Sequence, residues 1–168
     1  MRLADAGECD LRAFDCGAAS INEWLWQRAR RSDGDTSRTH VPLDGERRVV
    51  AYLTLHSACV ALAALPSARL RQNRPDPIPA VLIGRAGVAL DYQGRGLFHG
   101  LLKHAFGLIQ GVARNVAVSL VLVQPLDARV AETYRRLGFT PLRLKEAAEG
   151  PAEPVMPPPM FLPLAGIA

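Results

Sequence analysis

Two spacings of apolar residues recur along the chain, and each spacing predicts a different element. Apolar and polar positions alternate over residues 36–43 and 47–63, which predicts two β-strands. The segment between them, Asp44-Gly45-Glu46, consists of residues that favour a turn and predicts a hairpin. Apolar residues three or four positions apart predict helices over residues 20–31, about 95–110 and 127–137.

Residues at the ends of these helical segments match known capping patterns. Ser20 followed by Glu23 has the form of a capping box, in which the two side chains bond free amides at a helix start. Asp127 is of the type that caps the start of a helix, and Gly138 is of the type that ends one. We therefore expect the first helix to be capped by Ser20 and the third by Asp127.

The remaining apolar segments predict a sheet. A nearly continuous apolar run over 81–90 predicts a buried strand, in which Gly84 and Gly87 indicate a bulge or a close backbone approach. The order of elements predicts an α/β fold, a mixed sheet with helices on both faces, and the 168 residues are expected to form one domain, 1–168. Further strands are predicted over 115–123, 139–144 and 160–164, and residues 147–159 are expected to be irregular.

The composition is that of an ordinary globular protein. Apolar residues make up 49% and charged residues 21% of the chain, and no apolar run is long enough to cross a bilayer. A signal pattern is absent from the first residues, so a cytoplasmic protein is expected. Cys9, Cys16 and Cys59 lack metal-ligand spacing, so free thiols and no metal site are expected. The net charge of +4 favours an acidic partner only weakly.

The most informative segment follows the strand predicted over 81–90. Gly94 and Gly96 separate that strand from an amphipathic helix pattern. Such a turn leaves backbone N–H groups unpaired at the positive end of a helix dipole, which suits a phosphate group. The Rossmann pattern would need a third glycine at His99, and the Walker A pattern would need Gly-Lys-Ser/Thr, so neither applies.

Two segments resemble the GCN5-related N-acetyltransferase family. Gln93-Gly-Arg-Gly-Leu-Phe98 is similar to the acetyl-CoA motif of that family, Q/R-x-x-G-x-G/A. Ala131-Glu-Thr-Tyr-Arg-Arg-Leu-Gly-Phe139 is similar to its segment with a tyrosine and a terminal Gly-Phe. The resemblance implies the family's fold, a mixed and mostly antiparallel central sheet flanked by helices on both faces. It also implies N-acetyltransferase activity with acetyl-CoA as co-substrate.

A longer set of segments resembles the acetyltransferase toxins of toxin–antitoxin pairs, the TacT/AtaT type. These segments are Phe14-Asp-Cys-Gly17, Ile21-Asn-Glu-Trp-Leu25, Ser37-Arg-Thr39, Pro75-Asp-Pro-Ile-Pro79, Arg85, and Val123 to Asp127. The resemblance implies a toxin that acetylates the α-amine of aminoacyl-tRNA and thereby blocks translation. It also implies a ribbon-helix-helix antitoxin as a partner and a homodimer.

The resemblance further implies roles for individual residues. The turn amides would hold the pyrophosphate of acetyl-CoA, and the backbone around Gly87-Val88 would pair with the pantetheine amides. The expected cofactor-binding residues are Gly87, Val88, Gln93, Gly94, Arg95, Gly96, Leu97 and Phe98. Tyr134 matches the family's catalytic tyrosine, although its spacing from Val130 and Leu137 also fits a half-buried helical stripe.

Four arginines are candidates for binding tRNA. Arg28, Arg30 and Arg31 lie where the toxins carry a basic surface, and Arg85 matches an arginine of that group. Compensation of the helix dipole on a solvated face is an alternative explanation for the first three.

Several features depart from the family pattern: Phe98, Ala89, the His40-Val-Pro42 break in a hairpin strand, and a segment over 147–159 that is longer than usual. Phe98 stands where the family has glycine or alanine, and its ring either crowds the cofactor or turns inward with Leu102 and Ile109. Ala89 replaces the usual aspartate after the strand. Two alternative functions therefore stay open, an acetyltransferase for a protein or small-molecule amine and a non-catalytic binding module with the same fold.

Overall fold

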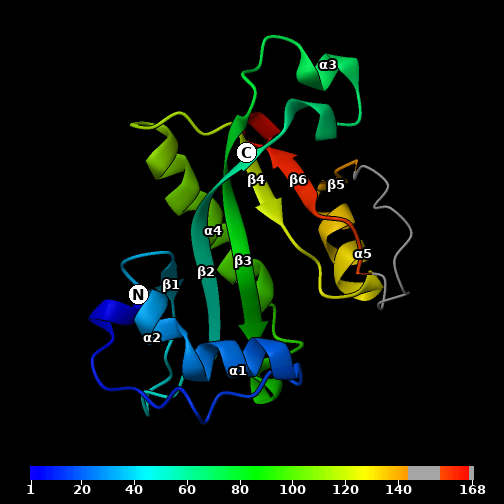
Figure 1. Ribbon diagram of the computed structural model, residues 1–168. Coiled ribbons are helices and arrows are strands. Elements are labelled where there is room, and N and C mark those ends of the chain that lie inside the picture. Colours follow the sequence, from blue (N-terminus) through cyan, green and yellow to red (C-terminus); the bar gives the residue numbers. More distant parts are fainter. Residues whose placement is uncertain (144–155, 167–168) are drawn as a thin grey trace. The chain divides into compact units, whose positions relative to one another are not determined.

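The computed structural model describes residues 1–143 and 156–166 (Figure 1). Residues 147–155 of the segment expected to be irregular, 147–159, therefore lie outside the described residues. The chain falls into two compact units. The first contains Met1–His56 and Ile83–Ile109, and the second contains Ser57–Leu82 and Gln110–Ala168. Each unit is described by itself below.

The strands form one six-stranded sheet in the order β1-β2-β3-β4-β6-β5. Strand β1 pairs antiparallel with β2, and β6 pairs antiparallel with both β4 and β5. The predicted α/β class and the mixed, mostly antiparallel sheet are therefore confirmed. The strands are β1 (Arg38–His40), β2 (Ala51–Val60), β3 (Ile78–Val88), β4 (Leu120–Val123), β5 (Thr140–Pro141) and β6 (Met160–Pro163). The predicted hairpin is also confirmed, and an antiparallel bridge between Leu43 and Val49 closes it.

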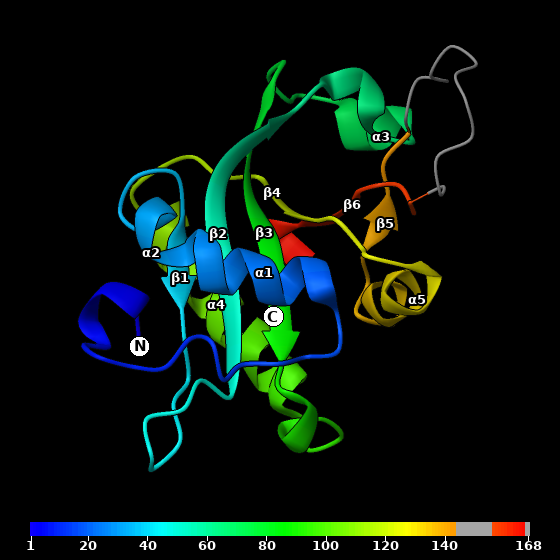
Figure 2. The same cartoon turned by 60° about the horizontal axis from the view of Figure 1, so that its bottom comes forward.

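Helices cover both faces of the sheet in the first unit. Tyr52 of β2 is fully buried, and its hydroxyl donates to the carbonyl of Ile21 in helix α1 (Ala19–Gln27) at 2.7 Å. Ala51, the neighbouring residue, faces the opposite side, where it lines a cavity with residues of helix α4 (Leu97–Ala113). Figure 2 shows α1 running across β2 and β3.

The predicted first helix is wrong in two respects. It is divided at Arg28 into α1 and helix α2 (Ala29–Ser32), and its N-cap is Ala18, which makes no side-chain capping bond. The expected cap at Ser20 fails because the preceding loop is fixed by a different residue. The carboxamide oxygen of Asn22 accepts from the amide of Cys16 at 3.0 Å, which draws Ser20 into the first helical turn.

The second unit confirms its predicted helix ends, and its predicted strands are shorter in the structure: β5 covers only Thr140–Pro141 and β6 covers Met160–Pro163. Asp127 caps helix α5 (Ala128–Arg136) by accepting from the amide of Val130 at 2.8 Å, and Gly138 ends it with φ +91°. The strand predicted over 115–123 begins only at Leu120, because α4 extends to Ala113 and the amide of Asn115 still bonds a helical carbonyl. The segment before β3 contains a short helix, α3 (Ala68–Arg71).

Two histidines meet beside the cavity in the first unit. His40 Nδ1 and His104 Nε2 are 3.3 Å apart, and the cavity has a volume of about 310 Å³. Burial first, and then the nearby His104, lowers the pKa of His40 to about 4. His40 is therefore neutral in the folded chain at neutral pH.

This burial predicts an acid-sensitive stability. The pKa of His40 is lower in the folded chain than the ordinary value of 6.5, so its contribution is complete above about pH 6.5 and is lost as the pH falls toward 4. We expect the free energy of unfolding in urea to fall by up to roughly 2 kcal/mol between pH 7.5 and 5. His40→Gln should flatten this dependence, whereas His99→Gln, at an exposed site, should leave it unchanged. An equally steep dependence in His40→Gln would contradict the assignment.

Candidate functional site

The predicted phosphate-binding turn is built by two glycines in a left-handed conformation. Gly94 has φ +74° and Gly96 has φ +78°, and no atom lies within 4 Å of the position that a Cβ would take on either. Helix α4 begins directly afterwards at Leu97 and is 17 residues long. The glycine turn (residues 93–98) therefore presents an open surface at the positive end of a long helix dipole, which suits an anion.

Gln93 holds this turn in place. Its side-chain amide donates to the carbonyl of Cys16 at 3.1 Å and to the carbonyl of Val88 at 2.9 Å. Gln93 was expected to bind the cofactor directly, but both of these bonds are made to the chain's own backbone. Its amide thus joins the end of β3 to the N-terminal loop.

The N-terminal loop is fixed by a pair of side chains that sequence reasoning assigned no role. The carboxylate of Asp15 accepts from the amide of Gly17 at 2.8 Å and from the side chain of Asn22 at 2.6 Å. These two bonds lower the pKa of Asp15, and the Gly17 bond has the larger effect. The amide of Leu90 bonds the carbonyl of Asp15 at 2.9 Å, so the loop also reaches the chain just before the turn. The Phe14-Asp-Cys-Gly17 and Asn22 positions had been noted only through the family resemblance.

A second support reaches the turn from the hairpin. Tyr92 donates its hydroxyl to the carboxylate of Asp44 at 2.9 Å, and Arg48 bonds the same carboxylate at 2.8 Å. Hydrogen bonds, first of all from the Arg48 amide, lower the pKa of Asp44 to about 2. The guanidinium of Arg95 lies 5.3 Å from the centre of the Tyr92 ring, within cation–π range. The sequence contains no local signal for this contact between residues 48 positions apart.

The glycine near the end of β3 is required by packing within the chain. A Cβ on Gly87 would lie 3.0 Å from Ile21, 3.2 Å from Phe14 and 3.3 Å from the sulfur of Cys16. The expected close approach at Gly87 is thus made by side chains of the N-terminal segment. Val88 is buried, and its carbonyl accepts from Gln93. Burial raises the pKa of the Cys16 thiol, which fits a packed thiol and argues against a nucleophile.

The first residues of α4 differ in burial. Leu97 and Phe98 are half-buried, whereas Leu102 and Ile109 are fully buried. Phe98 is therefore more exposed than Leu102 and Ile109, the apolar residues with which it was expected to pack.

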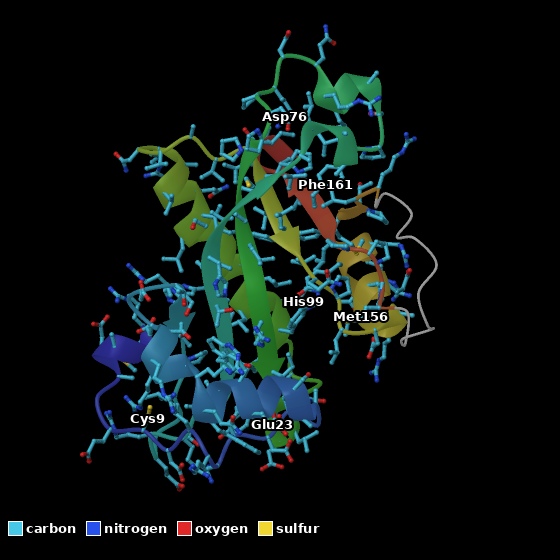
Figure 3. All side chains as sticks on the ribbon, in the orientation of Figure 1. Cys9, Glu23, Asp76, His99, Met156 and Phe161 are labelled. Carbon is cyan, nitrogen blue, oxygen red and sulfur yellow. The ribbon has the colours of Figure 1, made fainter. Side chains whose placement is uncertain are left out.

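The candidate arginines of the first unit differ in their contacts. Arg30 donates toward the carbonyl of Gly7 at 3.4 Å and that of Cys9 at 3.5 Å. Cys9, which Figure 3 labels, belongs to the N-terminal segment of the first unit. Within residues 1–143 and 156–166, Arg28 and Arg31 are exposed and make no side-chain hydrogen bond or ion pair. Arg85 is half-buried, with its guanidinium 5.3 Å from the centre of the Trp24 ring.

Tyr134 lies on α5 in the second unit. The residue is 5% exposed, and its ring packs against Phe139 at 5.2 Å in a T-shaped arrangement. Burial raises the pKa of Tyr134 to about 12, so the phenol is protonated at neutral pH. Glu132, on the same helix, pairs with Arg135 and Arg136 on an exposed face, which supports a solvated ion pair and not a catalytic base.

Two classes of feature are absent from the described part of the chain. Residues 1–143 and 156–166 contain no group of three or more His, Cys, Asp or Glu side chains that could hold a metal ion. None of the helices described there combines the length and the apolar character that a membrane crossing requires.

Comparison with known proteins places this geometry in a family. No family model matches the chain. The chain is 32% identical over 138 residues to a tRNA-acetylating toxin of Mycobacterium tuberculosis (strain ATCC 25618 / H37Rv), and this match covers 82% of the chain and 81% of that protein. The chain belongs to the family of tRNA-acetylating toxins.

Solved structures of acetyltransferase toxins also resemble this chain. AtaT complexed with acetyl-methionyl-tRNAfMet has a TM-score of 0.85 and 29% identity, over 99% of this chain and 95% of that chain. A tyrosine-to-phenylalanine variant of KacT has a TM-score of 0.83 and 26% identity, over 98% and 94%. AtaTR bound with AcCoA has a TM-score of 0.78 and 28% identity, over 98% and 92%. The family predicted from the sequence is therefore confirmed.

The left-handed glycines give a direct test of the turn. Gly96→Ala places a Cβ at φ +78°, a strained conformation for alanine, and should weaken acetyl-CoA binding roughly 5- to 10-fold. The measurement is calorimetric titration with acetyl-CoA. Gly107→Ala is the matched control, because it adds the same methyl group to the open side of α4 and should leave affinity unchanged. Equal affinities for wild type and Gly96→Ala would show that this conformation is not needed.

Proposed function

We propose that this protein is a toxin that transfers the acetyl group of acetyl-CoA to the α-amine of aminoacyl-tRNA. The proposal depends chiefly on one observation, the open glycine turn at the start of α4 in a chain of the tRNA-acetylating toxin family. It is supported by two relatives, AtaT complexed with acetyl-methionyl-tRNAfMet and AtaTR bound with AcCoA.

The glycine turn would hold the phosphates of acetyl-CoA. The open sides of Gly94 and Gly96 fit an anionic group that contacts backbone N–H groups. Arg95 would add a positive charge beside this group, oriented by the Tyr92 ring. Gln93 would act indirectly by holding the turn, and β3 near Gly87 and Val88 would guide the pantetheine arm.

The acceptor amine needs little activation. A free α-amine has a pKa of about 7.7–8.0, and the adjacent ester of an aminoacyl-tRNA lowers it, so much of the amine is neutral near pH 7. A strong general base is then unnecessary, which agrees with the solvated ion pairs of Glu132. Acetyl-CoA supplies an acetyl thioester that the neutral amine can attack directly.

Tyr134 would stabilise the thiolate that leaves. Its pKa of about 12 lies some 3.5 units above that of an ordinary thiol, so complete proton transfer would cost about 5 kcal/mol. The phenol O–H therefore acts as a hydrogen-bond donor to the developing negative charge, and solvent completes the protonation. A tyrosine-to-phenylalanine variant has also been made of the relative KacT, which fits a functional role for a tyrosine in this family.

The proposal includes the setting of the reaction. One N-acetyltransferase domain would span residues 1–168, because AtaT aligns over 99% of this chain. Because its proposed substrate is aminoacyl-tRNA, the protein would act in the cytoplasm. A toxin of this kind requires neutralisation, for which a ribbon-helix-helix antitoxin is the expected partner, and a homodimer is the expected assembly.

Replacing the tyrosine tests the catalytic assignment. Tyr134→Phe removes only the hydroxyl and should lower kcat roughly 100-fold or more while acetyl-CoA affinity changes little. The measurement is release of free thiol from acetyl-CoA in the presence of charged tRNA. Thr133→Ser, at a half-buried position next to Tyr134 on α5, keeps the hydroxyl that bonds the Arg129 carbonyl; it serves as the control and should keep full activity. Turnover of Tyr134→Phe within a few-fold of wild type would contradict the role.

Charge reversal tests the two exposed arginines that lack partners among the described residues. Replacing Arg28 and Arg31 with Glu should weaken tRNA binding and reduce the slope of log affinity against log salt by about 1–2. Filter binding across salt concentrations gives this slope. Arg114→Glu, at another exposed site, shows what a single charge reversal outside this helix does to the slope. An unchanged slope would assign Arg28 and Arg31 to an ordinary solvated helix end.

A further inference from the structure

Strand β3 contains one extra residue beside Arg85. A Cβ on Gly84 would meet His56 Nε2 at 2.6 Å and Thr54 Oγ1 at 3.1 Å, so Gly84 faces the same side of the sheet as these β2 residues. Gly87 faces Ile21 of α1, on that same side. In a regular strand, residues three positions apart face opposite sides, so the backbone between these two glycines forms a bulge.

A side chain of β2 accepts a hydrogen bond from a backbone amide in the bulge. The amide of Arg85 donates to Thr54 Oγ1 at 2.9 Å, where a regular strand would use a neighbouring carbonyl. Thr54 is fully buried, and its Oγ1 lies 3.0 Å from His56 Nε2. Thr54 therefore connects the backbone of Arg85 to the imidazole of His56.

The contact of His56 Nδ1 with Thr36 shows which group donates in the bond between His56 and Thr54. His56 Nδ1 lies 3.0 Å from the carbonyl oxygen of Thr36, which can only accept, so Nδ1 carries the proton. The neutral ring then has an unprotonated Nε2, which accepts from the Thr54 hydroxyl. The resulting chain runs from the Arg85 amide to Thr54 and on to His56, whose own N–H bonds Thr36. Both ring nitrogens are thus occupied, which argues against His56 as a general base.

The side chain of Arg85 is oriented by aromatic rings on the same side. Its guanidinium lies 5.3 Å from the centre of the Trp24 ring, and that ring stacks on Tyr52 with the planes 5° apart. The side chain starts from a backbone position that the bulge defines. A change in the bulge would therefore move the guanidinium relative to the Trp24 ring.

We propose that Thr54 and His56 are positioning residues for the acceptor substrate, acting through Arg85. They hold the bulge so that the Arg85 guanidinium faces an anionic group of that substrate, which under the proposed function is a tRNA phosphate. The role rests on that function for the identity of the substrate. Burial lowers the pKa of His56, and the positive charge of Arg85 acts in the same direction, so the neutral ring that the chain requires is present at neutral pH.

Substituting Thr54 tests whether this residue affects the KM for the acceptor substrate. Thr54→Val removes the hydroxyl at nearly constant volume and should raise the KM for aminoacyl-tRNA roughly 3- to 10-fold. The kcat and the KM for acetyl-CoA should stay within about twofold, because the glycine turn is untouched. Thr54→Ser keeps a hydroxyl and should restore the wild-type KM, which separates this effect from loss of stability.

A double-mutant cycle tests whether the effect passes through Arg85. Arg85→Ala should raise the KM for aminoacyl-tRNA by itself, and adding Thr54→Val should raise it no further. An equal further increase in the double variant would overturn the proposal, as would an unchanged KM in Thr54→Val. Gly84→Ala gives an independent arm, because its Cβ displaces His56 and should mimic Thr54→Val.

A readout independent of activity completes the test. Nitrogen NMR of the imidazole should find the His56 proton on Nδ1 in wild type, and a proton on Nε2 would overturn the proposal. Wild-type turnover is measured in the same assay as the variants. Absence of that turnover would refute the proposed function, whereas normal turnover with a KM indifferent to Thr54→Val would refute only the positioning role.

Discussion

The left-handed backbone of Gly94 and Gly96 is the constraint on which the candidate site depends. Two successive reversals of φ leave amide groups exposed at the start of a 17-residue helix, and a side chain at either position would be strained. Such a turn gains little from packing of its own, because no atom lies near either glycine's open side. Its geometry must therefore be fixed by neighbours, and Gln93 and Tyr92 provide these contacts from within the first unit.

The residues that hold the turn explain much of the surrounding sequence. Asp15 and Asn22 close the N-terminal loop, and Gln93 then bonds that loop to the end of β3. Gly87 allows the loop's side chains to pack directly on the strand. The chain thus uses several polar residues for support, while the anion itself would contact mainly backbone amides. This division agrees with a transfer reaction in which positioning matters more than a strong base.

Local chemistry was predictable from the sequence, and long-range pairing was not. Asp127 and Gly138 were found because a cap depends on a few adjacent residues. Ser20 failed as a cap because Asn22 binds the preceding loop. The contacts of Thr54 and His56 with β3 could not be read from alternation, because one extra residue near Arg85 shifts which side chains share a face. The family resemblance pointed to the turn and to Gln93 as a cofactor-binding residue, and the structure adds that the Gln93 amide bonds the carbonyls of Cys16 and Val88.

The central claim is that the acetyl group is transferred to the α-amine at the end of charged tRNA. The most direct measurement is mass spectrometry of the terminal aminoacyl-adenosine, released by ribonuclease after the purified protein has acted on charged tRNA with acetyl-CoA. The account predicts an acetyl group on the amino acid of that fragment, with uncharged tRNA unchanged. Acetyl groups found only on protein lysines or small amines, with aminoacyl-adenosine unmodified, would contradict it.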